Sequence, residues 1–204
     1  MWDSIRYGLT VLMVITVPPA FAWWLIIHPL APRLRSLGTR PTLIGMSALY
    51  FFMAAALYTV RSVLVGRDLG WDPGLFGIGV VLYAISVRVE LRTRRHLKFR
   101  TLAGVPELAG ETDLLLQEGI YSDVRHPRYL AVLIGLMSYA LMINYTSLYY
   151  VAIAALPAIA LVVALEEREL SDRFGQAYLE YKQRVPAFLP RNLRFLQERP
   201  EEGP

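Results

Sequence analysis

Residues 128–167 read RYLAVLIGLMSYALMINYTSLYYVAIAALPAIALVVALEE. Two apolar runs, Arg128 to Ile143 and Leu148 to Leu165, are separated only by the short segment NYTS. A connection this short joins neighbouring antiparallel helices. The sequence therefore predicts a helical hairpin whose two outer ends return to the same side. The start of the first run should then lie close to Glu166 and Glu167, which follow the second.

The composition places this hairpin in a membrane. Hydrophobic residues make up 55% of the 204-residue chain and charged residues only 19%, which is more apolar than an ordinary soluble domain. A membrane-spanning helix needs roughly 20 apolar residues, with about 17 as the lower limit. Five apolar blocks approach or exceed this limit: Ile5–Ile27, Thr42–Val65, Pro73–Val89, Arg128–Ile143 and Leu148–Leu165. The sequence predicts an all-α integral membrane protein with about five transmembrane helices.

The first block is expected to be a retained helix and not a signal peptide. It carries one early Arg6, and its apolar run ends in Trp23 and Trp24 without a small-residue cleavage site. Paired tryptophans are typical of a membrane interface. We expect the helix to bend at Pro18 and Pro19, because proline removes a backbone donor.

Basic residues predict the orientation of the chain. They gather, without an acidic residue among them, in the segments 28–41 and 92–100. By the positive-inside rule these two loops are cytoplasmic. Five spans then put the N-terminus outside and the C-terminus in the cytoplasm, as in a prokaryotic inner membrane. The net charge of +4 is accordingly a loop feature and does not indicate nucleic-acid binding.

The chain is expected to form a single membrane domain, 1–204. We expect three N-terminal spans in 1–91, a cytoplasmic loop in 92–127, the hairpin with a C-terminal helical segment in 128–190, and a flexible tail in 191–204. The chain has no cysteine and three histidines at unrelated spacings. Disulfides and thiolate chemistry are therefore excluded, and a metal site is not expected.

The residues that enter the hairpin predict an anion site. Proline is favoured at the first position of a helix, so Pro127 starts the helix and His126 becomes its N-cap. Helix N-termini attract anions through their unpaired N–H groups and the helix dipole. Arg125 adds a guanidinium that matches a carboxylate or phosphate.

The residues that leave the hairpin are carboxylates. Glu166 and Glu167 directly follow an apolar run, where a carboxylate is costly and so is a functional candidate. Glu166 shares a helix face with Glu169, whereas Glu167 points elsewhere. A plainer interpretation is also open: Arg125 and His126 then contact lipid headgroups and cap a helix, and the glutamates pair with nearby basic residues such as Arg168.

Two stretches, GIYSDVRHPRYLAVLIG and EERELSDRFGQAYLEYKQRVPAFLP, resemble the isoprenylcysteine carboxyl methyltransferase family and its phospholipid methyltransferase relatives. The family pattern falls on Gly119, Tyr121, Arg125, His126, Pro127, Tyr129, Glu166, Glu167, Phe174, Gly175, Tyr178, Tyr181, Val185, Pro186 and Pro190. The chain departs from the pattern at Ala131, where the family usually has glycine. The segment 101–118 reads as specific to this branch, and the first two spans carry no signature of the family.

The resemblance implies an S-adenosylmethionine-dependent methyltransferase. It implies a lipophilic acceptor, similar to an isoprenylcysteine carboxylate or a lipid, that enters from the bilayer at the cytoplasmic face. The implied catalytic residues are Arg125, Glu166 and Glu167. The implied cofactor-binding residues are Tyr121, Arg125, His126, Pro127, Tyr129, Glu167, Tyr178 and Tyr181.

Two other functions remain open on the sequence. Membrane sterol reductases, which use NADPH, resemble this family in their C-terminal part but are larger. A lipid-binding protein without catalytic activity is the second alternative. The acceptor and the oligomeric state are left open.

Overall fold

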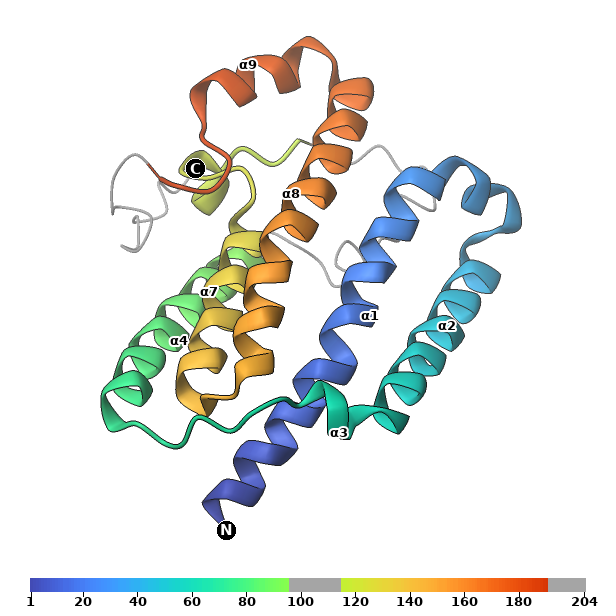
Figure 1. The fold of residues 1–204 in the computed structure, drawn as a ribbon. Helices are drawn as coiled ribbons and strands as arrows, with labels where there is room; N and C mark the ends of the chain where they lie inside the picture. Colours follow the sequence, from blue (N-terminus) through green and yellow to red (C-terminus); the bar gives the residue numbers. More distant parts are fainter. Residues whose placement is uncertain (96–114, 191–204) are drawn as a thin grey trace.

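The structure is a computed structural model that describes residues 1–95 and 115–190. Its helices run along the chain as shown in Figure 1. They are α1 (Trp2–Leu37), α2 (Thr39–Thr59), α3 (Arg61–Leu64), α4 (Pro73–Arg94), the 3-10 helix η1 (Gly119–Ser122), α7 (Pro127–Ile143), α8 (Thr146–Phe174) and α9 (Gln176–Arg184). The loop residues 96–114 and the tail 191–204 lie outside the described part, so the predictions made for them stay predictions.

The expected helices are present, and the all-α prediction is confirmed. Within the described residues, four helices, α1, α2, α4 and α8, are long and apolar enough to cross a membrane, whereas α7 is a shorter apolar helix of 17 residues. The exact number of spans therefore stays a prediction. The second apolar block does not form one helix up to Val65, since α2 ends at Thr59 and the short α3 follows Val60. α1 continues through Pro18 and Pro19 to Leu37.

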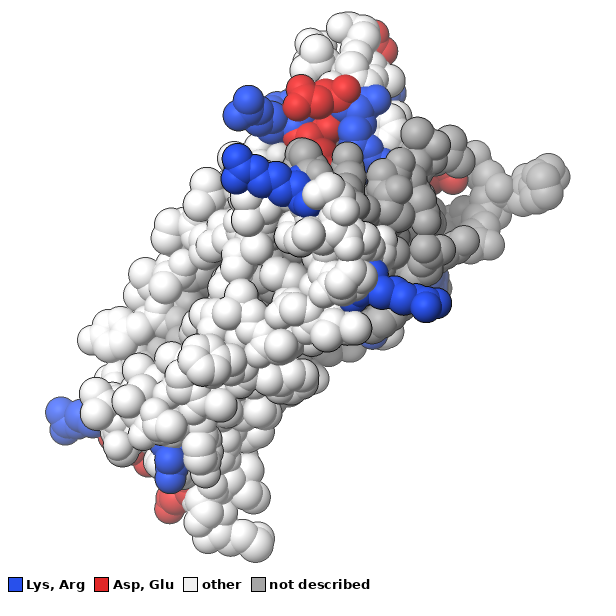
Figure 2. Space-filling model, turned by 90° about the vertical axis from the view of Figure 1, so that its right-hand side faces the viewer, with Lys and Arg blue, Asp and Glu red and all other residues white. Residues whose placement is uncertain are grey.

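The helices form an open row in the order α2, α1, α8, α7 and α4, with contacts between successive neighbours (Figure 1). Many large apolar side chains point away from this row, among them Ile44, Phe51, Phe52, Val81 and Ile153. In Figure 2 a broad white band separates the charged side chains at the two ends of the molecule. A band without charged residues that exposes large apolar side chains is unfavourable in water and suits a bilayer. The chain is an all-α integral membrane protein.

α4 and α7 approach each other closely at two small residues. A Cβ atom added at Gly79 of α4 would lie 2.5 Å from Cγ of Met142 and 2.9 Å from the carbonyl oxygen of Ser138, both on α7. Farther along, the hydroxyl of Ser86 donates a hydrogen bond of 2.8 Å to the carbonyl oxygen of Ala131. Ala131 is 3% exposed and packs with Val89. The departure from the family pattern at Ala131 thus lies in the α4–α7 contact.

We expect Gly79→Ala to lower stability by about 1–3 kcal/mol, because the new methyl group overpacks a close helix contact. Gly77→Ala is the matched control. Gly77 lies on the same helix, and a Cβ atom added there would meet nothing within 4 Å among the described residues. Thermal unfolding of both variants in detergent measures the difference. Equal melting temperatures for the two variants would contradict the close approach of α4 and α7.

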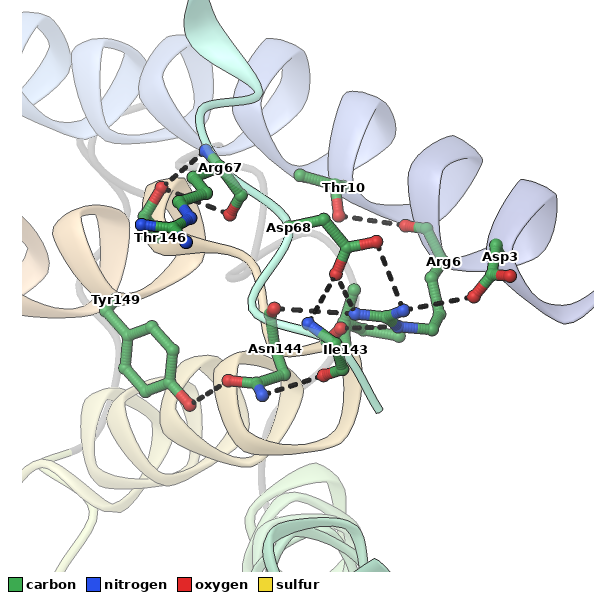
Figure 3. A network of polar contacts seen from close by, with 10 residues as sticks. Asp3, Arg6, Thr10, Arg67, Asp68, Ile143, Asn144, Thr146 and Tyr149 are labelled. Atoms are coloured by element: carbon green, nitrogen blue, oxygen red, sulfur yellow. Dashed lines mark hydrogen bonds and ion pairs between the residues drawn. The ribbon is translucent and has the colours of Figure 1, made fainter. Parts of the chain in front are cut away.

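At the end of the molecule that carries the N-terminus, a buried arginine connects α1 to the hairpin turn (Figure 3). The side chain of Arg6 is only 1% exposed. It donates to the carbonyl oxygen of Ile143 at 2.8 Å and pairs with the carboxylate of Asp68 in the loop before α4. Burial raises the pKa of Asp68, but hydrogen bonds from Gly70 and Arg6 outweigh it and keep the pKa below its ordinary value.

The hairpin turn itself is tied to the same loop. Asn144 adopts the left-handed conformation (φ 59°) that ends α7, and its side-chain amide donates to the carbonyl oxygen of Gly70 at 2.8 Å. The backbone N–H of Leu69 donates to the carbonyl oxygen of Asn144 at 3.1 Å. α1, the loop before α4 and the turn between α7 and α8 therefore form one connected unit. From the sequence, Arg6 was only an early positive charge, and this role was not predicted.

Candidate functional site

The residues singled out at the two ends of the hairpin meet at the opposite end of the molecule from Arg6, where α9 folds back (Figure 1). α8 has 29 residues. At about 1.5 Å per residue it is about 43 Å long, whereas the hydrocarbon core of a bilayer is about 30 Å thick. Glu166 and Glu167 follow the start of α8 at Thr146 by 20 and 21 residues, which is about 30 Å along the helix. They therefore lie at the edge of an apolar layer of this thickness, and only the turns after them extend beyond it.

The start of α7 follows the expectation from its proline. Pro127 is the first helical residue and His126 is the N-cap. The His126 side chain makes no capping hydrogen bond. Its imidazole points to the carboxylates of α8 instead, with Nε2 3.2 Å from Oε1 of Glu167 and Nδ1 3.6 Å from Oε2 of Glu166. His126 therefore lies between the two glutamates.

Arg125 binds an anion that belongs to the protein itself. Its Nη2 lies 2.5 Å and its Nε 3.2 Å from Oε1 of Glu167. Its Nη1 donates to the carbonyl oxygen of Lys182 at 3.0 Å and also to that of Val185. The Arg125 side chain is 8% exposed. Arg125 thus joins the end of α8 to the C-terminal segment.

Glu167 is the centre of this ion-pair network, which comprises Arg125, His126, Glu167 and Lys182. Its Oε1 accepts from Arg125 and contacts His126, while its Oε2 lies 2.6 Å from Nζ of Lys182. The side chain of Glu167 is 13% exposed and that of Lys182 is 45% exposed. The network therefore has a buried part at Oε1 and an accessible part at Oε2.

Glu166 is placed differently from Glu167. Its Oε2 is buried and makes no hydrogen bond to any residue of the described chain. Its distance of 3.6 Å to His126 Nδ1 is too long for a hydrogen bond. Buried carboxylate oxygens normally have a hydrogen-bond partner. Glu166 thus offers an acceptor oxygen at the mouth of the hairpin.

The C-terminal segment reaches the site by a sharp reversal after α8. Gly175 has φ 54°, ψ −129°, a conformation that favours glycine, and α9 begins directly after it. Beyond α9 the chain runs beside the entry of α7. There the N–H groups of Arg125 and His126 donate to the carbonyl oxygens of Pro186 (2.9 Å) and Ala187 (3.0 Å).

The four tyrosines of the sequence prediction do not share one cluster. Tyr178 and Tyr181 are buried on α9, and the hydroxyl of Tyr181 donates to the carbonyl oxygen of Tyr121 at 2.7 Å. Burial raises the pKa of Tyr178 above its ordinary value, and the negative charge of Glu167 raises it further. Its hydroxyl therefore stays protonated beside the ion-pair network. Tyr129 belongs to another cluster and contacts His126, with ring centroids 5.9 Å apart.

α1 also reaches the site. The guanidinium carbon of Arg128 lies 4.6 Å from the ring centre of Trp24, a cation–π contact that joins the start of α7 to α1. Neither this contact nor the role of Lys182 was predicted. Both join positions far apart in the chain, and no local spacing signals them. Within residues 1–95 and 115–190, no three His, Cys, Asp or Glu side chains are grouped to hold a metal ion.

The part of the chain that forms the hairpin matches a known protein family. The sequence model of the phospholipid methyltransferase family matches residues 75–177, which extend from α4 through the hairpin to the start of α9. The match covers half of the chain. The chain belongs to the phospholipid methyltransferase family. The resemblance read from the motif residues is thereby confirmed.

Two curated relatives are similar to part of the chain. Methanethiol S-methyltransferase 1 of Bradyrhizobium diazoefficiens is 38% identical over 71 residues, which are 35% of this chain and 24% of the relative. Protein-S-isoprenylcysteine O-methyltransferase B of Arabidopsis thaliana is 36% identical over 77 residues, which are 37% of this chain and 39% of the relative. The chain thus matches well under half the length of either relative. No solved structure matches the chain.

Proposed function

We propose that the chain is a membrane methyltransferase that takes its methyl group from S-adenosylmethionine. The donor binds at the mouth of the α7–α8 hairpin, on the cytoplasmic side, and the acceptor is lipophilic and enters from the bilayer. The observation that carries the proposal is the convergence of Arg125, His126, Glu166 and Glu167 at one point. Because the chain belongs to the phospholipid methyltransferase family, we assign this point of convergence to the methyl donor.

The residues at the site fit the donor. S-adenosylmethionine supplies an electrophilic methyl group on a sulfonium, next to an ammonium, a carboxylate and a ribose diol. Glu166 Oε2 is a buried acceptor without a hydrogen bond to the described residues, and ionised carboxylates bind ammonium and hydroxyl groups well. The start of α7 at Pro127 suits the carboxylate, because a helix N-terminus attracts anions. The rings of Tyr121, Tyr129, Tyr178 and Tyr181 remain proposed donor contacts.

Arg125 acts in this proposal as a positioning residue. Its guanidinium donates to Glu167 and to two carbonyl oxygens of the C-terminal segment. It holds the Glu167 carboxylate at the hairpin mouth and keeps α9 folded over it. Pre-organised groups of this kind supply orientation and electrostatic stabilisation without reorganisation during the reaction.

The protonation state of the acceptor determines what the site must do. A carboxylate acceptor needs no base, and positioning in a dry pocket is then the main contribution of the chain. An amine or thiol acceptor must lose a proton. Glu166, next to Nδ1 of His126, is the carboxylate we assign to take it up. The names of the two relatives specify an S- and an O-methyl acceptor, so both cases occur among its relatives.

Calorimetry of the purified full chain in detergent tests the proposal. We expect S-adenosylmethionine and S-adenosylhomocysteine to bind and NADPH to show no binding. Incubating membranes with methyl-labelled donor and extracting lipid and protein fractions separately then identifies the class of acceptor. Binding of NADPH without binding of either adenosyl compound would favour the reductase alternative and overturn the proposal.

A further inference from the structure

Lys182 already places an ammonium group at the proposed donor site. Its Nζ lies 2.6 Å from Oε2 of Glu167. Glu166 carries a buried acceptor oxygen 3.6 Å from the imidazole of His126, which also contacts Glu167. We propose that Lys182 marks the subsite for the α-ammonium group of the methyl donor and competes with the donor for it. This inference rests on the proposed function and adds a residue outside the family motif.

The two halves of the ion-pair network differ in how easily they can open. Arg125 is 8% exposed and donates to three separate oxygens, one of them twice, so its release would uncover several buried groups. Lys182 is 45% exposed and contacts Glu167 through one oxygen. Ion pairs of exposed lysines contribute little net stability. A ligand can therefore replace Lys182 and leave the buried half intact.

The chemistry of the subsite matches a primary ammonium. The carboxylate oxygen that Lys182 contacts accepts from a group with three N–H donors, and the amino-acid part of the donor carries the same group. Oε1 of Glu167 is held by Arg125 and His126, which leaves Oε2 as the oxygen that can change partners. A bound donor then places its ammonium where Nζ of Lys182 lies, while the flexible lysine side chain moves into solvent.

Competition of this kind lowers the apparent affinity for the donor. The apparent affinity equals the intrinsic affinity multiplied by the fraction of molecules in which the subsite is open. An exposed ion pair closes the subsite only part of the time. Removing it should therefore tighten ligand binding by about two- to fivefold.

The experiment compares Lys182→Met with the wild type in binding of two ligands to the full chain in detergent. S-adenosylhomocysteine carries the α-ammonium, whereas 5′-methylthioadenosine keeps the adenosine and thioether and lacks the amino-acid part. We expect the dissociation constant of S-adenosylhomocysteine to fall about two- to fivefold in Lys182→Met, and that of 5′-methylthioadenosine to stay unchanged.

Arg184→Met is the matched charge control. Arg184 lies two residues farther along α9 and donates to the side chain of Gln117 at 3.0 Å, outside the ion-pair network. The Arg184→Met variant removes one positive charge, as Lys182→Met does, and we expect both ligands to bind it as they bind the wild type. This control separates direct competition from a general electrostatic effect of a basic helix on a cationic ligand.

Three results would overturn the inference: unchanged or weaker binding of S-adenosylhomocysteine to Lys182→Met, an equal gain in Arg184→Met, or an equal gain for 5′-methylthioadenosine. A folded wild type that binds neither ligand is a different failure. It overturns the proposed function and the inference together.

Discussion

Replacing Glu167 by glutamine is expected to reduce kcat/KM for methyl transfer about 10- to 100-fold, the loss that corresponds to charge-assisted hydrogen bonds of about 1.5–3 kcal/mol. Glutamine keeps the size of the side chain and one acceptor oxygen but removes the negative charge that holds Arg125, His126 and Lys182. The positive groups of the site then repel each other and the cationic donor. Turnover with methyl-labelled donor, together with calorimetric donor binding, measures the effect.

Glu180→Gln is the matched control for this variant. Glu180 lies on α9, is exposed, and accepts from the side chain of Gln176 at 3.3 Å, away from the network. We expect its turnover to equal that of the wild type. Wild-type kcat/KM in Glu167→Gln would remove Glu167 from the proposed mechanism.

The truncation Glu167→Ala should in addition lower the stability of the folded protein. It leaves Arg125 and His126 buried without their carboxylate, and breaking a buried ion pair from one side costs about 3–5 kcal/mol. A lower melting temperature in Glu167→Ala than in Glu167→Gln is therefore part of the same expectation. The glutamine variant keeps the test of function separate from the test of folding.

A second large effect on stability is expected at the other end of the molecule. We expect Arg6→Met to destabilise the protein by about 3 kcal/mol, because it leaves the carbonyl oxygen of Ile143 without its donor and Asp68 without its cation. The figure is at the low end of the range for buried pairs, since Asp68 is 38% exposed and can hydrate. Denaturant unfolding in detergent measures it.

Asp3→Asn is the control for Arg6→Met. Asp3 also pairs with Arg6, at 3.2 Å, but its side chain is 83% exposed, and such pairs contribute little. We expect the Asp3 variant to unfold like the wild type. Equal stability of Arg6→Met and Asp3→Asn would show that the buried network of Figure 3 does not hold α1 to the hairpin turn.

Some features of the site follow from the chain alone. Pro127 starts α7 because a proline costs nothing at the first helical position, and His126 is the N-cap for the same reason. The short turn after Ile143 forces α7 and α8 to run antiparallel, which brings the segment that carries Arg125 to the same end of the hairpin as Glu166 and Glu167. These are consequences of local geometry and of chain length, so the sequence determines them without knowledge of other contacts.

Other features depend on segments that meet only after folding. Arg6 looks like an ordinary positive charge near the start of the chain, and its burial depends on Asp68 and on the carbonyl oxygen of Ile143, 137 residues away. The position of Ala131 in the α4–α7 contact likewise depends on Ser86 of another helix. Sequence spacing carries no information about such pairs.

The sequence by itself determined the apolar blocks, the hairpin and the charged residues at its mouth, because hydrophobic length and a short turn act within the chain. The tertiary structure decided which partner each charge has. Arg125 faces Glu167 and the carbonyl oxygens of Lys182 and Val185, and Glu167 faces Lys182, because the chain reverses at Gly175 and returns to the hairpin mouth. An ion pair forms only where two separate segments are held within a few ångströms, and that distance is a property of the folded molecule.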